Sequence, residues 1–172
     1  EIPGKTDNPV ILGWFAAAGH ADVTHDEEAW CSACMDAAAK EADLPMPPPN
    51  INLMARSWLT WGATVDKNAQ AIQAALDAGF DVVVVWPRGD PNGPYGHVNI
   101  VEKVLGPTVV CIGGNQSTGT SSDAVTRAKP RKISDAVGFR RSVPATVKAL
   151  RDAGSTTINR ADTKEKLGIV AV

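Results

Sequence analysis

The chain has 172 residues, of which 44% are hydrophobic, enough for one globular domain with a single core. Its formal net charge of -2 argues against the broad basic surface typical of nucleic-acid binding. Three cysteines are too few, and odd in number, for a disulfide scaffold, so we expect free thiols at Cys31, Cys34 and Cys111.

Helical signals fill the first half of the chain. Asn8 and Pro9 suit the N-cap and the first helical position, and Thr24 and Glu27 fit a capping box. Helices are predicted over four segments, which are residues 10–18, about 29–42, 52–61 and 66–78. The proline-rich stretch 44–49 must be an extended connector between the second and third of them.

The pattern changes after Gly79, where β-branched residues and alternation become common. Strands are predicted over residues 81–86, 97–104, 108–112 and 136–140. Residues 113–132 are polar and rich in glycine and serine, which predicts a loop. Helices followed by hairpin-connected strands predict an α+β fold, with N-terminal helices packed on a small antiparallel sheet.

Three residues have the chemistry of a cysteine hydrolase. Cys31 lies in the first turn of a predicted helix, where the helix dipole favours a thiolate. His97 begins an apolar strand directly after Gly96, which lets the backbone approach another element closely. Asn115, or its neighbour Gln116, could hold the imidazole in the tautomer that takes a proton from sulfur.

Other interpretations of the same residues stay open. Cys31 can be a small core residue, His97 a structural histidine and Asn115 a turn residue. Trp30-Cys31-Ser32-Ala33-Cys34 resembles the redox motif of thioredoxins, although the charged residues before it cannot form the central strand that a thioredoxin needs. A zinc site is less favoured, because two cysteines within one helix are unlike the usual ligand pairs on turns; the possible ligands are Cys31, Cys34, His97 and Cys111.

Six segments together resemble the small cell-wall hydrolases of the CHAP and NlpC/P60 superfamily. They occur in order over about residues 1–141, and they are Glu1-Ile2-Pro3-Gly4, Glu28-Ala29-Trp30-Cys31-Ser32-Ala33, Ala55-Arg56-Ser57-Trp58-Leu59-Thr60-Trp61-Gly62, Gly96-His97-Val98, Gly113-Gly114-Asn115-Gln116 and Val137-Gly138-Phe139-Arg140-Arg141.

The resemblance implies a papain-like core with Cys31 as nucleophile, His97 as base and Asn115 as the orienting residue. It also implies peptidoglycan as substrate, cut by an endopeptidase or an N-acetylmuramoyl-L-alanine amidase at an amide bond in or beside the stem peptide. Gln116 and Asp26 are possible supporting residues. Four aromatic residues could line the substrate groove, namely Trp58, Trp61, Trp86 and Tyr95. Core packing is the expected role for at least two of the three tryptophans.

The chain departs from that pattern at residues 66–79, an added helix, and at Cys34, where an aromatic residue is common. Residues 142–172 form a polar tail, and the apolar end 168–172 is a candidate start of a membrane anchor, the one expected route to membrane association. We expect a monomer that acts on the cell wall or in the periplasm, with no cofactor, no metal and no nucleic-acid partner. Its export route is not predicted.

A phage or prophage endolysin is the favoured interpretation of these features. The alternatives are a secreted antibacterial effector with the same chemistry, an inactive cell-wall-binding or virion module, and a thiol-disulfide oxidoreductase that uses Cys31 and Cys34.

Overall fold

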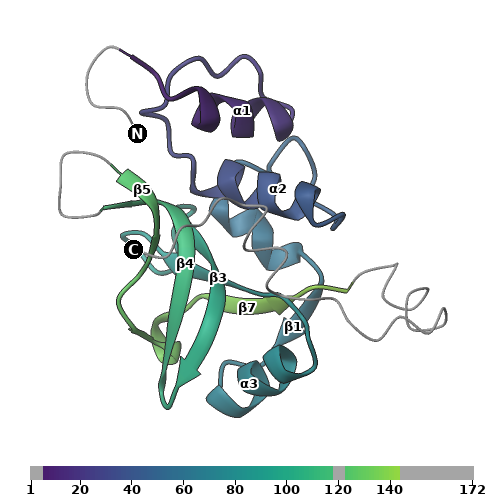
Figure 1. Cartoon of the computed structure of the whole chain (residues 1–172). Coiled ribbons are helices and arrows are strands. Elements are labelled where there is room, and N and C mark those ends of the chain that lie inside the picture. Colours follow the sequence, from purple (N-terminus) through teal and green to yellow (C-terminus); the bar gives the residue numbers. More distant parts are fainter. Residues whose placement is uncertain (1–5, 118–122, 144–172) are drawn as a thin grey trace, which may run out of the picture.

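The computed structural model describes residues 6–117 and 123–143, which form a mixed helical and sheet structure (Figure 1). The helical elements are α1 (Pro9–Ala17), α2 (Cys31–Glu41), the 3₁₀ helix η1 (Ala55–Thr60), α3 (Ala69–Asp77) and the 3₁₀ helix η2 (Ile133–Asp135). The strands are β1 (Ala63–Val65), β2 (Val82–Pro87), β3 (Gly96–Leu105), β4 (Thr108–Ser117), β5 (Asp123–Arg127), β6 (Arg131–Lys132) and β7 (Gly138–Arg141).

The strands form one antiparallel sheet in the order β1-β7-β2-β3-β4-β5, with β6 paired to β4. The predicted α+β class is therefore confirmed. The register of β2 and β3 places Trp86 opposite His97 and Val85 opposite Val98. Because neighbouring residues of a strand point to opposite faces, these two pairs lie on different faces of the sheet.

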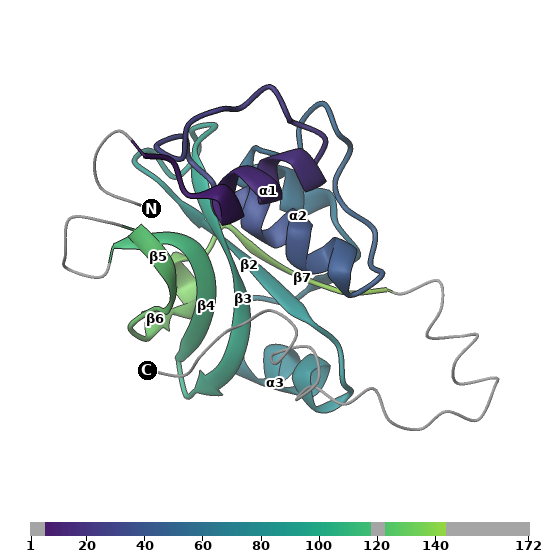
Figure 2. The same ribbon diagram turned by 45° about the horizontal axis from the view of Figure 1, so that its top comes forward.

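The two faces of the sheet are covered by different helices. Val83, Val85 and Val98 pack with α2 and η1 in one buried cluster. Val82, Val84 and Trp86 pack with α3 in another. Figure 2 shows α2 and α3 on opposite sides of β2 and β7. The unbroken valine run of β2 thus reflects burial on both faces.

The predicted start of α1 is confirmed, and α2 begins at Cys31, close to its predicted start at about residue 29, but the predicted capping box is wrong. The Asn8 side chain accepts a hydrogen bond from the Val10 backbone nitrogen at 2.9 Å, with Pro9 as the first helical residue. The capping box at Thr24 does not form, because α2 begins only at Cys31 with Trp30 as its N-cap. The thiol therefore occupies the first helical position.

The predicted loop over residues 113–132 is also wrong. Strand β4 continues to Ser117, and β5 and β6 both pair with it. The glycines that indicated a turn are instead needed for close packing, as described below. The three-residue strand β1 was too short for a pattern to reveal, and the segment 52–61 contains the 3₁₀ helix η1.

The chain beyond β7 is described only as far as Val143, so most of the predicted tail lies outside the described residues. Ser142, assigned to that tail, is 2% exposed and belongs to the fold. Its backbone nitrogen donates to the Asp81 carbonyl at 2.9 Å, and its hydroxyl accepts from the Asp81 nitrogen at 3.1 Å. Within the described ranges, the helices are too short or too polar to cross a bilayer.

Candidate active site

Cys31 is the first residue of α2 and is 3% exposed. Its N-cap, Trp30, makes no side-chain capping bond, so the first backbone N–H groups of the helix are free to face the sulfur. Burial raises the pKa of the Cys31 thiol, and the backbone groups of Val98, Ser32 and Cys31 itself, together with the charge of Arg88, oppose that rise. The resting residue is therefore a neutral thiol, not the thiolate that the helix dipole alone would favour.

The thiol lies against the strand that carries His97. Its hydrogen-bond partners are backbone groups, those of the helix start and that of Val98, the residue after His97. Cys31 and Val98 also share one buried cluster. The beginning of β3 therefore lies at the beginning of α2, and the charge of Arg88 lowers the pKa of both Cys31 and His97. His97 is paired with Trp86 on the face of the sheet opposite Val98, so the thiol meets the strand backbone while the imidazole projects from the other face.

His97 is half-buried and uncharged at neutral pH. Burial is the main reason that its pKa is lowered to about 4, while a side-chain hydrogen bond with Gln116 acts in the opposite direction. Since a base must be unprotonated to accept a proton, the neutral ring is in the correct state for general-base chemistry.

Gln116, and not Asn115, is the residue in contact with His97. The Gln116 amide nitrogen donates to the carbonyls of Gly113 at 2.8 Å and Thr126 at 2.7 Å. This fixes the amide so that its oxygen faces the ring of His97. The Asn115 amide instead donates to Asp123 at 3.4 Å.

The backbone of β4 explains why Gln116, and not Asn115, contacts His97. Asn115 has a φ of 56°, in the left-handed region, and the β4–β5 register shifts between Gly113 and Gln116. Such an irregularity re-aims the side chains that follow it. A regular turn or strand, as the sequence predicts, gives no sign of this change.

Asn99 is a second neighbour of His97 that the sequence analysis missed. It is 1% exposed, and its oxygen accepts from the Trp86 indole nitrogen at 2.9 Å. Because an indole nitrogen can only donate, this bond orients the Asn99 amide. The amide nitrogen then lies 3.1 Å from His97 Nε2 and 3.3 Å from the Gln116 oxygen. The signal was present, since residues 97 and 99 share a strand face.

Two glycines of β4 let this region pack closely. A Cβ at Gly114 would lie 2.3 Å from the Trp30 ring and 2.9 Å from the Cys34 Cβ. A Cβ at Gly113 would lie 2.0 Å from the Asn99 amide nitrogen. Gly114 therefore allows the start of α2 to pack directly on β4, and Gly113 leaves room for the Asn99 side chain.

The other two cysteines differ in position. Cys34 lies one turn along α2 and is partly exposed, whereas Cys111 is 2% exposed on β4. Cys111 belongs to the cluster under α3, on the other face of the sheet from Cys31. The zinc ligand set considered above is therefore not brought together. Burial raises the pKa of Cys34 and of Cys111 to about 12.

The aromatic residues proposed for the groove are mostly core residues. Trp58 and Trp86 are fully buried, and Trp61 is 5% exposed. Their indole nitrogens donate to Ser32, Asn99 and the Pro45 carbonyl respectively. Tyr95 alone is open to solvent, at 72% exposure. Core packing therefore accounts for the tryptophans, as the sequence analysis expected for at least two of them.

An apolar hollow of about 510 Å³ runs along α2 from Cys34 to Glu41, bounded by α1 and by β3, β4 and β5. Cys34, Met35, Trp14, Ile112 and Gly113 are among its lining residues, and Lys40 and Glu41 supply its charges. Cys31, one helical turn before Cys34, is not among its lining residues.

Asp26 is a structural residue of the segment that leads into α2. It is 1% exposed, and its carboxylate accepts from the Asn8 backbone nitrogen at 3.0 Å. Its own backbone nitrogen donates to Asp7 Oδ1 at 3.0 Å. These reciprocal bonds join the start of α1 to residues 24–27.

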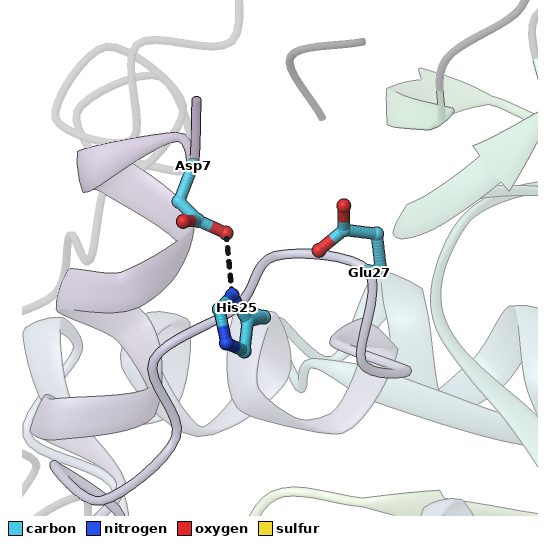
Figure 3. A group of neighbouring side chains, drawn as sticks. All are labelled: Asp7, His25 and Glu27. Atoms are coloured by element: carbon cyan, nitrogen blue, oxygen red, sulfur yellow. Dashed lines mark ion pairs between the residues drawn. The ribbon is translucent and has the colours of Figure 1, made fainter. Parts of the chain in front are cut away.

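Three side chains next to these bonds have the ligand types of a divalent-cation site (Figure 3). Asp7, His25 and Glu27 each offer one ligand atom, and these atoms lie within 4.8 Å of one another. His25 Nδ1 is 3.5 Å from Asp7 Oδ1, and the His25 side chain is 72% exposed. The contact between His25 and Asp7, at the surface where the start of α1 meets residues 24–27, accounts for this arrangement without a metal.

No protein-family model, curated protein or solved structure matches this chain. The likeness to cell-wall hydrolases therefore rests on the sequence motifs alone.

Proposed function

We propose that this protein is a cysteine hydrolase that cleaves an amide bond in or beside the stem peptide of peptidoglycan, with Cys31 as nucleophile and His97 as general base. The observation that carries the proposal is the position of the Cys31 thiol, at the first residue of α2 and against the backbone that follows His97. The order of the motifs supports peptidoglycan as substrate and an endolysin as the kind of enzyme.

The reaction starts from a neutral pair. His97 takes the thiol proton as sulfur attacks the carbonyl carbon, and then gives this proton to the leaving amine. Because His97 projects from the face of Trp86 and the Cys31 thiol packs on the face of Val98, this transfer requires the imidazole to swing around the start of β3 towards the thiol. Water then hydrolyses the thioester, with His97 again as base.

Gln116 is proposed as the orienting residue in place of Asn115. The side-chain hydrogen bond between Gln116 and His97 raises the pKa of the ring, so it stabilises the imidazolium that forms when His97 takes the thiol proton. The backbone N–H groups at the start of α2 are suited to stabilise the oxyanion, because no side chain caps this helix start.

The test is lysis of purified sacculi by the wild-type protein and by two cysteine variants. Cys31→Ala should abolish lysis while its circular dichroism and melting temperature stay near those of the wild type. Cys111→Ala removes a buried thiol on the other face of the sheet and should remain lytic. Mass spectrometry of the released muropeptides identifies the bond that is cut. Lysis by Cys31→Ala at the wild-type rate would refute the proposal.

A further inference from the structure

Cys34 has no role in the proposed hydrolysis, yet it shares the first turn of α2 with the nucleophile. The Cys34 backbone nitrogen donates to the Trp30 carbonyl at 2.9 Å, which closes that turn. Residues three apart on a helix are neighbours, with Cβ atoms about 5–6 Å apart. The two sulfurs are close enough that charge on Cys31 contributes to the raised pKa of Cys34.

We propose that Cys31 and Cys34 form a reversible disulfide when the protein meets a peroxide, and that this bond protects the Cys31 sulfur from irreversible oxidation. The loss of lytic activity on oxidation rests on the function proposed above. The disulfide itself does not depend on it.

The geometry permits the bond at a modest cost. A disulfide needs Cβ atoms roughly 3.5–4.5 Å apart, so closure must draw the two residues together by about 1–2 Å. This change falls in the first turn of α2, which no side chain caps. A bond closed against helix geometry is strained, and strained disulfides are the readily reduced ones.

The surroundings of Cys34 allow both steps. Cys34 lines the apolar hollow along α2, so a small oxidant that enters it comes within one helical turn of Cys31. A hydrogen bond with the Gly114 backbone holds Cys34 in place. Cys111 cannot compete for the bond, since it lies on the opposite face of the sheet.

The chemistry balances with peroxide as the only oxidant. Cys31 sulfur, as the thiolate, attacks one peroxide oxygen; the O–O bond breaks, and the leaving hydroxide takes up the proton that the thiol lost, giving a sulfenic acid and water. Cys34 sulfur then attacks Cys31 sulfur, the S–O bond breaks and a second water leaves. Two thiols thus lose two electrons and two protons to one peroxide.

The experiment compares the wild-type protein with Cys34→Ala and Cys111→Ala after limited treatment with hydrogen peroxide. Peptide mass mapping of the wild type and of Cys111→Ala should show a Cys31–Cys34 disulfide. Dithiothreitol should restore the original mass and most of the lytic activity of both proteins. In Cys34→Ala, Cys31 should gain oxygen and lytic activity should stay lost, since sulfinic acid is not reduced by thiols.

Uptake of oxygen by Cys31 in the wild type, with Cys34 still open to alkylation, would overturn the proposal. Full recovery of oxidised Cys34→Ala would also overturn the protective role. The mass readout does not depend on lysis. If the reduced wild type fails to lyse sacculi but forms the bond, only the proposed function fails.

Discussion

Gly114 lies directly against Trp30, where an added Cβ would stand 2.3 Å from the indole ring. This contact joins β4, which carries Gln116, to the residue that caps the helix of Cys31. How closely the start of α2, which carries Cys31, packs on β4 therefore depends on the absence of a Cβ at Gly114.

Gly114→Ala should accordingly destabilise the fold by roughly 2 kcal/mol or more, because neither backbone nor a buried ring can yield easily. The measurement is thermal or urea unfolding, with lysis of sacculi as a second readout. Gly13→Ala is the matched control, since its added Cβ meets nothing within 4 Å on an exposed position of α1. That control should gain about 0.5–1 kcal/mol from helix propensity. Equal stability of the two variants would contradict the packing described here.

Gln116→Ala should lower kcat/KM by roughly 10- to 100-fold, less than a general base itself contributes. Asn115→Gly should lower kcat/KM far less, because glycine readily adopts the positive φ of residue 115.

The acid limb of the pH profile of kcat/KM reports the pKa of His97, which lies at about 4. It should move to lower pH in Gln116→Ala, since the hydrogen bond that raises this pKa is lost. A larger loss of kcat/KM in Asn115→Gly than in Gln116→Ala would show that Asn115, and not Gln116, orients His97.

Alkylation of Cys31 by iodoacetamide should be slow at pH 7 and should accelerate only above pH 9. Burial raises the pKa of this thiol, and only the thiolate reacts. Peptide mass mapping separates Cys31 from the other two cysteines. Rapid labelling at pH 6 would instead indicate a resting thiolate paired with a protonated His97.

Asp36 and His97 should give opposite pH dependences to the free energy of unfolding. Both Asp36 oxygens are buried without a hydrogen-bond partner; the Asn52 amide is near but donates to the Ala18 carbonyl. Burial raises the pKa of Asp36 to about 7, so its stabilisation is present below pH 4 and is lost as the pH rises through 7. The lowered pKa of His97 acts in reverse, and stability is lost as the pH falls from 6.5 towards 4.

Between pH 8 and pH 5 these two effects are each on the order of 2 kcal/mol and nearly cancel in the wild type. Asp36→Asn should therefore lose stability on acidification, whereas His97→Asn should gain it. Urea unfolding at the two pH values measures both slopes. Parallel slopes in the two variants would show that one of the groups is not buried as described.

The sequence predicted the parts of the fold that local chemistry decides. The Asn8–Pro9 start of α1 and the valine run of β2 need no distant partner to be recognised. The capping box was wrongly predicted because Thr24 and Glu27 are locally plausible, while the actual N-cap, Trp30, is fixed by Gly114, which lies far along the chain.

The site was predictable only in part for the same reason. Cys31 and His97 have local signals, a helix start and a strand start. The choice of Gln116 over Asn115 depends on a positive φ and a register shift in β4, which arise from pairing with β5. Residue type alone ranks the two amides equally.

The most direct test of the account is to trap the acyl group on sulfur. Wild-type protein is mixed with soluble peptidoglycan fragments and quenched in acid within one turnover, and its peptides are then analysed by mass spectrometry. The account predicts a thioester on Cys31 whose added mass equals the acyl part of the cleaved substrate. Unmodified Cys31 at every quench time, while the wild type releases cleaved product and Cys31→Ala does so at the same rate, would contradict it.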